Sequence, residues 1–247
     1  MSVFQDLVIA YRVLAQHGVI DAYGHVSVRC PNNRERFWMA RALAPELVTE
    51  ADLMEFDLDS APIDPRGRSP VIERFIHGQI YRARPEVNAV VHNHSPAVIP
   101  FSCTNTPLQP IFHMAAFIGL GVPNWEIRDA QKGTDMLVRD NALGASLART
   151  LGPHPAALMR GHGAVVVGEN LPRAVGRSVY LELNARLQFQ AHVLAGGSGG
   201  VVFMDGAEVA ANVSWQAYER FWTLCRMKVI KELEAEAAGR AAGAAAR

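Results

Sequence analysis

Two histidines separated by one residue stand at the end of a short apolar run. His92 and His94 directly follow the segment 89–91, which reads Ala-Val-Val. Residues two apart in a strand point to the same face, about 7 Å from each other, so both imidazoles could bind one ion. A surface pair, or two histidines hydrogen-bonded within the protein, is the alternative that this motif alone leaves open.

A third histidine lies in a glycine-flanked connection. His162 stands between Gly161 and Gly163, and these three residues join two apolar segments at 156–160 and 164–168. Glycine adopts backbone angles that a Cβ forbids and lets other groups approach closely. A ring on so tight a connection can be directed into a site, although a turn histidine without a role is the better explanation when the residue is judged alone.

An acidic residue precedes the histidine pair. Glu73 begins a predicted helix over 72–82, which Pro85 ends. A carboxylate in the first turn stabilises a helix through the dipole, but it could also act as a general acid or base, or as a fourth metal ligand. His77 follows one turn later and could hydrogen-bond with Glu73, which predicts a structural or supporting role.

The spacing of apolar residues predicts one α/β domain over 1–233 and a low-complexity tail over 234–247. Strands occur in neighbouring pairs as well as alternating with helices, which favours a mixed or antiparallel sheet. The predicted strands lie at 24–29, 36–40, within 45–59, 88–94, 156–160 and 164–168. The predicted helices lie at 3–18, 72–82, after Ser95-Pro96, 134–151, from Asn170 to about 196–200, and from near Trp215.

Composition argues against several classes of protein. The 24 basic and 24 acidic residues cancel and form no charged block, so we expect neither nucleic acid nor a membrane as partner. No run approaches eighteen apolar residues, and the first residues predict an amphipathic helix rather than a signal peptide. Three scattered cysteines predict reduced thiols. We therefore expect a cytoplasmic protein.

The segments that carry the candidate residues resemble the class II aldolase/adducin family. "ERFIHGQIYRARPEVNAVVHNHSP" at 73–96, followed by "MRGHGAVVVG" at 159–168, resembles the glutamate, HxHSP and GHG motifs of this family in order and spacing. The resemblance implies a three-layer α/β/α sandwich around a mixed, largely antiparallel central sheet. It implies that His92, His94 and His162 bind a divalent metal and that Glu73 is the acid/base residue. It also implies a C4 homotetramer.

The sequence departs from the sugar-phosphate aldolases of that family. "MARALAPEL" at 39–47 and "SPVIE" at 69–73 lack most of the hydroxyls and glycine amides that suit a phosphate. Arg41 stands there instead, and its planar guanidinium would suit a carboxylate; a solvated surface arginine is the alternative. We therefore expect a small-molecule carboxylate as substrate.

Two further histidines separate the sequence from the aldolases. His25, in "GHVSVR" at 24–29, replaces the asparagine of the family motif, and His113 lies in "PIFHMAAF" at 110–117. Such imidazoles could hydrogen-bond an acidic substrate or move a proton, although core histidines explain both equally well. We predict that His25 assists Glu73 in catalysis and that Ser27, Arg41 and His113 bind the substrate.

Together these segments resemble the decarboxylase branch of the family, which includes 3-hydroxy-2-methylpyridine-4,5-dicarboxylate decarboxylase. The resemblance implies a carbon–carbon lyase that decarboxylates an ortho-hydroxy aromatic or heteroaromatic mono- or dicarboxylate in aromatic compound catabolism. The cation would be manganese or zinc, with iron or cobalt as further options. An aldolase or epimerase acting on a small non-phosphorylated hydroxy-carbonyl compound is the first alternative. A non-catalytic adducin-like binding protein is the second.

Overall fold

A seven-stranded sheet forms the centre of the protein. The computed structural model describes residues 2–213 and 218–245. The strand order is β3-β2-β1-β4-β7-β6-β5, and every neighbouring pair is antiparallel except β5 and β6. The strands are β1 His25–Arg29, β2 Arg36–Ala40, β3 Leu53–Asp57, β4 Ala89–Asn93, β5 Asn124–Trp125, β6 Ala156–Met159 and β7 Gly163–Gly168.

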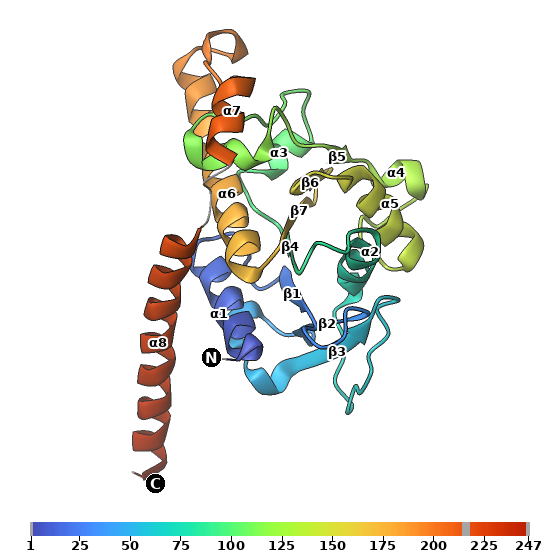
Figure 1. Ribbon diagram of the computed structural model, residues 1–247, viewed down its shortest axis with the longest axis vertical. Helices are drawn as coiled ribbons and strands as arrows, with labels where there is room; N and C mark the ends of the chain where they lie inside the picture. The colour runs from blue at the N-terminus through green and yellow to red at the C-terminus, as the bar shows by residue number, and fades with distance from the viewer. Residues whose placement is uncertain (1, 214–217, 246–247) are drawn as a thin grey trace.

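Helices cover both faces of this sheet (Figure 1). On one face, α1 (Val3–Gln16) and α6 (Leu171–Leu194) bury apolar side chains against the strands. On the other face, α2 (Phe75–Ala83) and α5 (Asn141–Leu151) form a second core with the opposite sides of the same strands. Alternation of side chains along each strand divides them between the two cores. The predicted three-layer α/β/α architecture with a mixed, largely antiparallel sheet is therefore confirmed.

Shorter elements and a long last helix complete the fold. Helix α8 (Glu219–Ala245) begins beyond α7 (Gly206–Val213), runs beside α1 and is held there by an Arg12–Glu236 ion pair of 2.7 Å. Trp215 lies outside the described residues. No helix in the described part of the chain is both long and apolar enough to cross a membrane. The other elements are α3 Ile99–Ser102, α4 Ile127–Ala130, and the 3₁₀ helices η1 Pro45–Leu47, η2 Glu50–Asp52, η3 Ile72–Arg74, η4 His113–Ile118 and η5 Ser198–Gly200.

The predicted helix over 134–151 is wrong in its first half. Helix α5 begins only at Asn141, where the Asp140 side chain accepts the main-chain N–H of Leu143 as an N-cap. Residues 134–140 are irregular, and Met136 has a φ of 71°. Likewise, the helix expected directly after Ser95-Pro96 begins only at Ile99. The irregular segment 134–140 contributes directly to the site described below.

Strand register brings the N-terminal and central candidate residues together. In the β1–β4 pair, His25 lies opposite His92 and Ser27 lies opposite Val90. Val90 belongs to the core under α2, whereas its neighbours Ala89 and Val91 belong to the core under α1 and α6. His92 therefore projects from the α2 side of the sheet, and so does His25, which is paired with it on β1.

Candidate metal centre

Four predicted site residues converge at one end of β4. One ligand atom from each of Glu73, His92, His94 and His162 lies within 4.8 Å of all the others. Strand β4 provides His92, and His94 follows its last residue. The tight β6–β7 connection provides His162, and η3 at the entrance to α2 provides Glu73. The fold thus unites side chains from three distant segments of the chain.

The ring of His162 is held in one orientation. Its Nδ1 lies 2.9 Å from the main-chain oxygen of Met136, so Nδ1 carries the hydrogen and Nε2 presents a lone pair. That Nε2 lies 3.1 Å from Nε2 of His94. A Cβ at Gly163 would stand 1.9 Å from the main-chain oxygen of Asn93. Glycine at 163 is therefore what lets this connection approach the end of β4.

The two carboxylate oxygens of Glu73 have different surroundings. Oε1 accepts the main-chain N–H of Val138 at 3.0 Å. Oε2 lies 3.5 Å from Nε2 of His92 and 3.5 Å from Nε2 of His162. Burial by itself raises the pKa of Glu73, but the imidazoles of His162 and His92 close to Oε2 outweigh it and hold that pKa below its ordinary value. The carboxylate is therefore ionised at neutral pH.

Unsatisfied imidazole nitrogens indicate that these four side chains could hold a divalent cation. Neither ring nitrogen of the fully buried His92 has a hydrogen-bond partner among the described residues, and burial lowers its pKa, so the ring is neutral. Such an orphaned lone pair is costly unless something binds it. Ligands about 2.1 Å from one tetrahedral ion lie about 3.4 Å apart, and the His94–His162 separation is 3.1 Å. Three imidazoles and one carboxylate fit a divalent transition metal.

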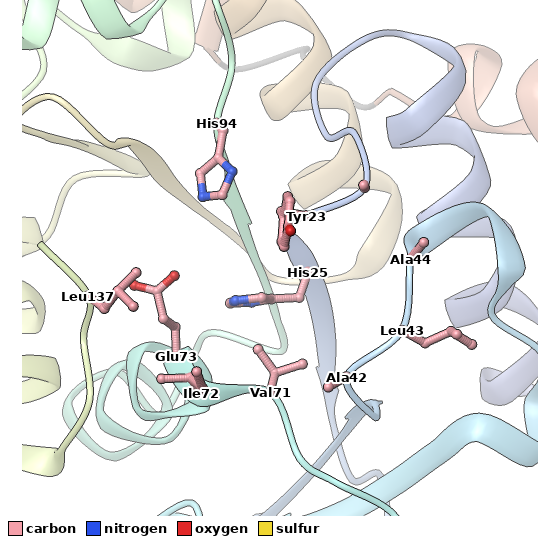
Figure 2. A pocket seen from close by; sticks show the side chains of 12 residues that line it. Tyr23, His25, Ala42, Leu43, Ala44, Val71, Ile72, Glu73, His94 and Leu137 are labelled. Carbon is pink, nitrogen blue, oxygen red and sulfur yellow. The ribbon is translucent and has the colours of Figure 1, made fainter. Parts of the chain in front are cut away.

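A cavity of about 450 Å³ opens beside this cluster. Figure 2 shows Glu73, His94 and His25 projecting into it, with Leu137 beside Glu73. Most of its remaining wall is aliphatic, and no lysine, arginine, serine or threonine lines it in the part of the chain that the structure describes. The lining consists of Ala22, Tyr23, Gly24, His25, Ala42, Leu43, Ala44, Val71, Ile72, Glu73, His94 and Leu137. This cavity suits a flat, largely apolar group with its polar end at the cluster.

The other predicted site residues lie at different places. His25 lines the cavity, but the hydroxyl of Ser27 is buried against other side chains. Arg41 directly precedes the lining residues 42–44, but its side chain forms a 2.7 Å ion pair with Asp52. His113 is exposed in η4. The cavity of a single chain therefore gives no support to the substrate-binding roles predicted for Ser27, Arg41 and His113, which stay predictions.

Several supporting groups escaped the sequence-based analysis. The main-chain oxygen of Met136 and the main-chain N–H of Val138 orient His162 and Glu73, and main-chain groups leave no signal in residue identity. The expected Glu73–His77 hydrogen bond does not form. The chain kinks at Glu73 (φ −87°, ψ 20°) between η3 and α2, and His77 instead contacts His25 and Ser27.

Known proteins are similar in sequence to most of this chain. Residues 5–189 match the model of the class II aldolase and adducin N-terminal domain. Decarboxylase tropJ of Talaromyces stipitatus is 36% identical over 234 residues, which cover 86% of this chain and 88% of that protein. The 3,4-dihydroxyphthalate decarboxylase of Arthrobacter keyseri is 30% identical, over 83% of this chain and 85% of the relative.

A solved structure extends the match to three dimensions. The L-fuculose 1-phosphate aldolase from Glaciozyma antarctica superposes with a TM-score of 0.75 at 28% identity, and the match covers 94% of this chain and 90% of that one. Fold, motif order and overall similarity thus agree over most of the chain. The protein belongs to the class II aldolase and adducin family.

Proposed function

We propose that this protein is a metal-dependent carbon–carbon lyase that removes a carboxylate from an ortho-hydroxy aromatic or heteroaromatic acid. The observation that carries the proposal is the cluster of Glu73, His92, His94 and His162 at the edge of a largely aliphatic cavity. The names of two relatives, decarboxylase tropJ and 3,4-dihydroxyphthalate decarboxylase, support the reaction class.

The three imidazoles are the proposed metal ligands. The Met136 carbonyl keeps Nδ1 of His162 protonated, so its Nε2 can bind a cation. A divalent ion at this position would act as a Lewis acid that stabilises negative charge on the ring oxygen of the substrate. Manganese or zinc is the proposed ion, with iron or cobalt as alternatives that have the same ligand preferences.

Glu73 is the proposed proton carrier. Its carboxylate is ionised, so it can accept the proton of the substrate's ortho-hydroxyl group. The carbon–carbon bond then breaks, carbon dioxide leaves, and the bonding electron pair stays with the ring. Glu73 returns its proton to the ring carbon that lost the carboxylate, and the product takes a proton from water on release. The net reaction consumes one proton for each carboxylate removed.

The cavity supports an aromatic substrate over a sugar phosphate. Val71, Ile72 and Leu137 lie near the glutamate, and the segment 42–44 contributes the aliphatic wall across from them (Figure 2). A phosphate would need cationic side chains, hydroxyls or a helix N-terminus. The lining residues include no lysine, arginine, serine or threonine, and Tyr23 is the one lining residue whose side chain carries a hydroxyl. An aromatic ring needs apolar walls with a few polar groups at one end.

A product assay tests this function directly. Protein loaded separately with manganese, zinc, iron or cobalt is incubated with 2-hydroxybenzoate and with dihydroxyphthalates, and released carbon dioxide is measured. We expect carbon dioxide release that stops when a chelator removes the ion. Aldehyde formation from small hydroxy-ketones without any decarboxylation would instead establish the aldolase alternative. Inactivity towards both substrate classes in an intact, metal-loaded protein would favour an adducin-like binding protein.

We also propose a homotetramer in the cytoplasm. Large apolar side chains are exposed at the end of α6 and on α8, namely Phe189, Val193, Leu194, Leu224 and Met227. Within each of the two helices these side chains lie within two turns of one another, and such groups of exposed apolar side chains often mark contacts between subunits. A small-molecule carboxylate remains the proposed substrate class whatever the assembly.

A further inference from the structure

A chain of four buried polar side chains leads from the cavity into the core beneath α2. Nδ1 of His25 lies 2.6 Å from Nε2 of His77, and Nδ1 of His77 lies 2.6 Å from the hydroxyl oxygen of Ser27. That oxygen lies 2.8 Å from the hydroxyl of Tyr81. Only His25 lines the cavity, and all four side chains are almost completely buried.

The direction in which these hydrogen bonds are donated follows from the contacts of Tyr81 at the inner end. Ser27 Oγ is the one acceptor that the Tyr81 hydroxyl meets among the described residues, since the nearby main-chain N–H of Val90 can only donate. A buried hydroxyl without an acceptor costs about 1–3 kcal/mol, so Tyr81 donates to Ser27. The hydrogen of Ser27 then has one remaining acceptor, which is Nδ1 of His77.

The same reasoning continues to the cavity. Because Nδ1 of His77 accepts a hydrogen bond, its ring hydrogen must be on Nε2, which donates to Nδ1 of His25. Nδ1 of His25 is then an acceptor, and the hydrogen of the neutral ring is on Nε2. Figure 2 shows the ring of His25 extending from β1 toward Glu73. If the hydrogen bonds instead ran from His25 toward Tyr81, the buried Tyr81 hydrogen would have no acceptor.

We propose that Tyr81, Ser27 and His77 form a directional hydrogen-bond network that holds His25 as its Nε2–H tautomer. His25 thereby offers the cavity a neutral hydrogen-bond donor beside the metal cluster, and His77, Ser27 and Tyr81 are positioning residues. The network also makes His25 unsuitable as a further metal ligand, because its cavity-facing nitrogen has no available lone pair.

The donor suits an anionic oxygen of the substrate. A fixed N–H binds a carboxylate or phenolate oxygen and adds no charge to a site that contains the Glu73 carboxylate and would also hold a cation. The identity of that oxygen rests on the proposed function, but the tautomer of His25 does not. Burying four polar groups is tolerated because every donor between Tyr81 and His25 finds an acceptor.

The inner end of the network is itself fixed. The guanidinium of Arg29 lies 4.7 Å from the centre of the Tyr81 ring and donates to the main-chain oxygens of Tyr81, Val87 and Arg84. A cation held over the ring in this way fixes Tyr81 between α2 and β1. The Tyr81 hydroxyl therefore cannot readily turn to another partner.

Nitrogen NMR of the full-length protein with ¹⁵N-labelled histidine tests the tautomer. Spectra are recorded after zinc loading and again after chelation, with His25→Gln used to assign the signals. We expect His25 as a single Nε2–H tautomer in both samples. A wild-type His25 with its hydrogen on Nδ1 would overturn the proposal, and this outcome does not depend on any substrate or turnover.

Variants test whether the network sets the tautomer. The double variant Ser27→Ala, Tyr81→Phe removes both hydroxyls, and we expect His25 to become a mixture of tautomers. Tyr11→Phe is the matched control, since Tyr11 is equally buried but its hydroxyl accepts the main-chain N–H of Ala40 outside the network. The control should keep the wild-type tautomer. If the double variant also keeps it, the network does not position His25.

A binding measurement separates this proposal from the proposed function. We expect His25→Leu to weaken 2-hydroxybenzoate binding to zinc-loaded protein by about tenfold, and His25→Gln, which keeps an N–H donor, to weaken it less. Equal affinity in all three proteins would show that His25 does not bind the anion. If the tautomer is found but no decarboxylation occurs, the proposed reaction fails while the network stands.

Discussion

The two carboxylate oxygens of Glu73 contact different groups at the proposed metal centre. Oε1 is occupied by the Val138 N–H, whereas Oε2 faces His92 and His162. Glu73→Gln keeps an acceptor for Val138 and nearly the same shape, but it cannot carry a proton. We expect the variant to retain metal and to lose turnover by a factor of about 10²–10⁴. Elemental analysis and carbon dioxide release measure the two effects separately.

Metal-ligand variants provide the comparison. His92→Ala, His94→Ala and His162→Ala should each lose most of the metal, whereas His154→Ala, which removes an exposed ring outside the cluster, should keep it. Full metal occupancy in all three ligand variants would contradict the ligand assignment. A wild-type rate in Glu73→Gln would contradict the proposed proton transfer, and Glu73 would then serve only to hold the segment 134–140 in place.

Buried neutral histidines make stability depend on pH. Burial lowers the pKa of His77 from its ordinary value of 6.5 to about 3, so the unfolded chain binds a proton that the folded protein excludes. His77 therefore stabilises the fold fully above pH 6.5 and progressively less as the pH falls toward 3. In metal-free protein, we expect His77→Gln to reduce the slope of unfolding free energy against pH by about 1.4 kcal/mol per pH unit near pH 5. Urea unfolding at several pH values measures this slope, and an unchanged slope would contradict the burial of a neutral ring.

At the scale of elements, the β6–β7 connection sets the position of His162 against β4. A Cβ at Gly163 would overlap the Asn93 main-chain oxygen and lie 3.0 Å from Cα of His94. We expect Gly163→Ala to destabilise the protein by about 1–3 kcal/mol and to lower metal occupancy, because β4 and the connection must separate. Thermal unfolding and elemental analysis measure the two effects.

Gly121→Ala is the matched control for that variant. A Cβ at Gly121 meets no atom within 4 Å, so the substitution should change neither stability nor metal content appreciably. If Gly163→Ala behaved like this control, the close approach of the two segments would not be what positions His94 and His162.

Sequence patterns predicted elements better than they predicted connections. The helix and strand periods of α1, β1, β2, β4, β6, β7 and α6 were evident because each helix buries one face against a core and the strands divide their side chains between the two cores. The segment 134–140 was wrongly predicted as helix, since its apolar residues fit a helical period. Its conformation is set by contacts with Glu73 and His162, which lie far away in sequence. Tertiary contacts of this kind override local propensity.

At the scale of the whole molecule, exposed apolar side chains on α6 and α8 predict assembly. Light scattering should give a mass four times the 27.0 kDa of one chain. Leu194 is 89% exposed and Phe189 is 61% exposed, so the double variant Phe189→Ser, Leu194→Ser should lower that mass if these side chains lie between subunits. A monomeric wild-type protein would contradict the tetramer.

The sequence by itself determined the fold class, the family and the identity of the four clustered residues, because chemistry-bearing side chains in fixed order and spacing are visible without coordinates. It could not determine which other groups meet them. The register that places His25 opposite His92, the main-chain contacts of Met136 and Val138, and the displacement of Ser27 and Arg41 from the cavity depend on packing between distant segments. Side-chain direction and main-chain hydrogen bonding arise only when the sheet and its covering helices are assembled, so the tertiary structure alone decided them.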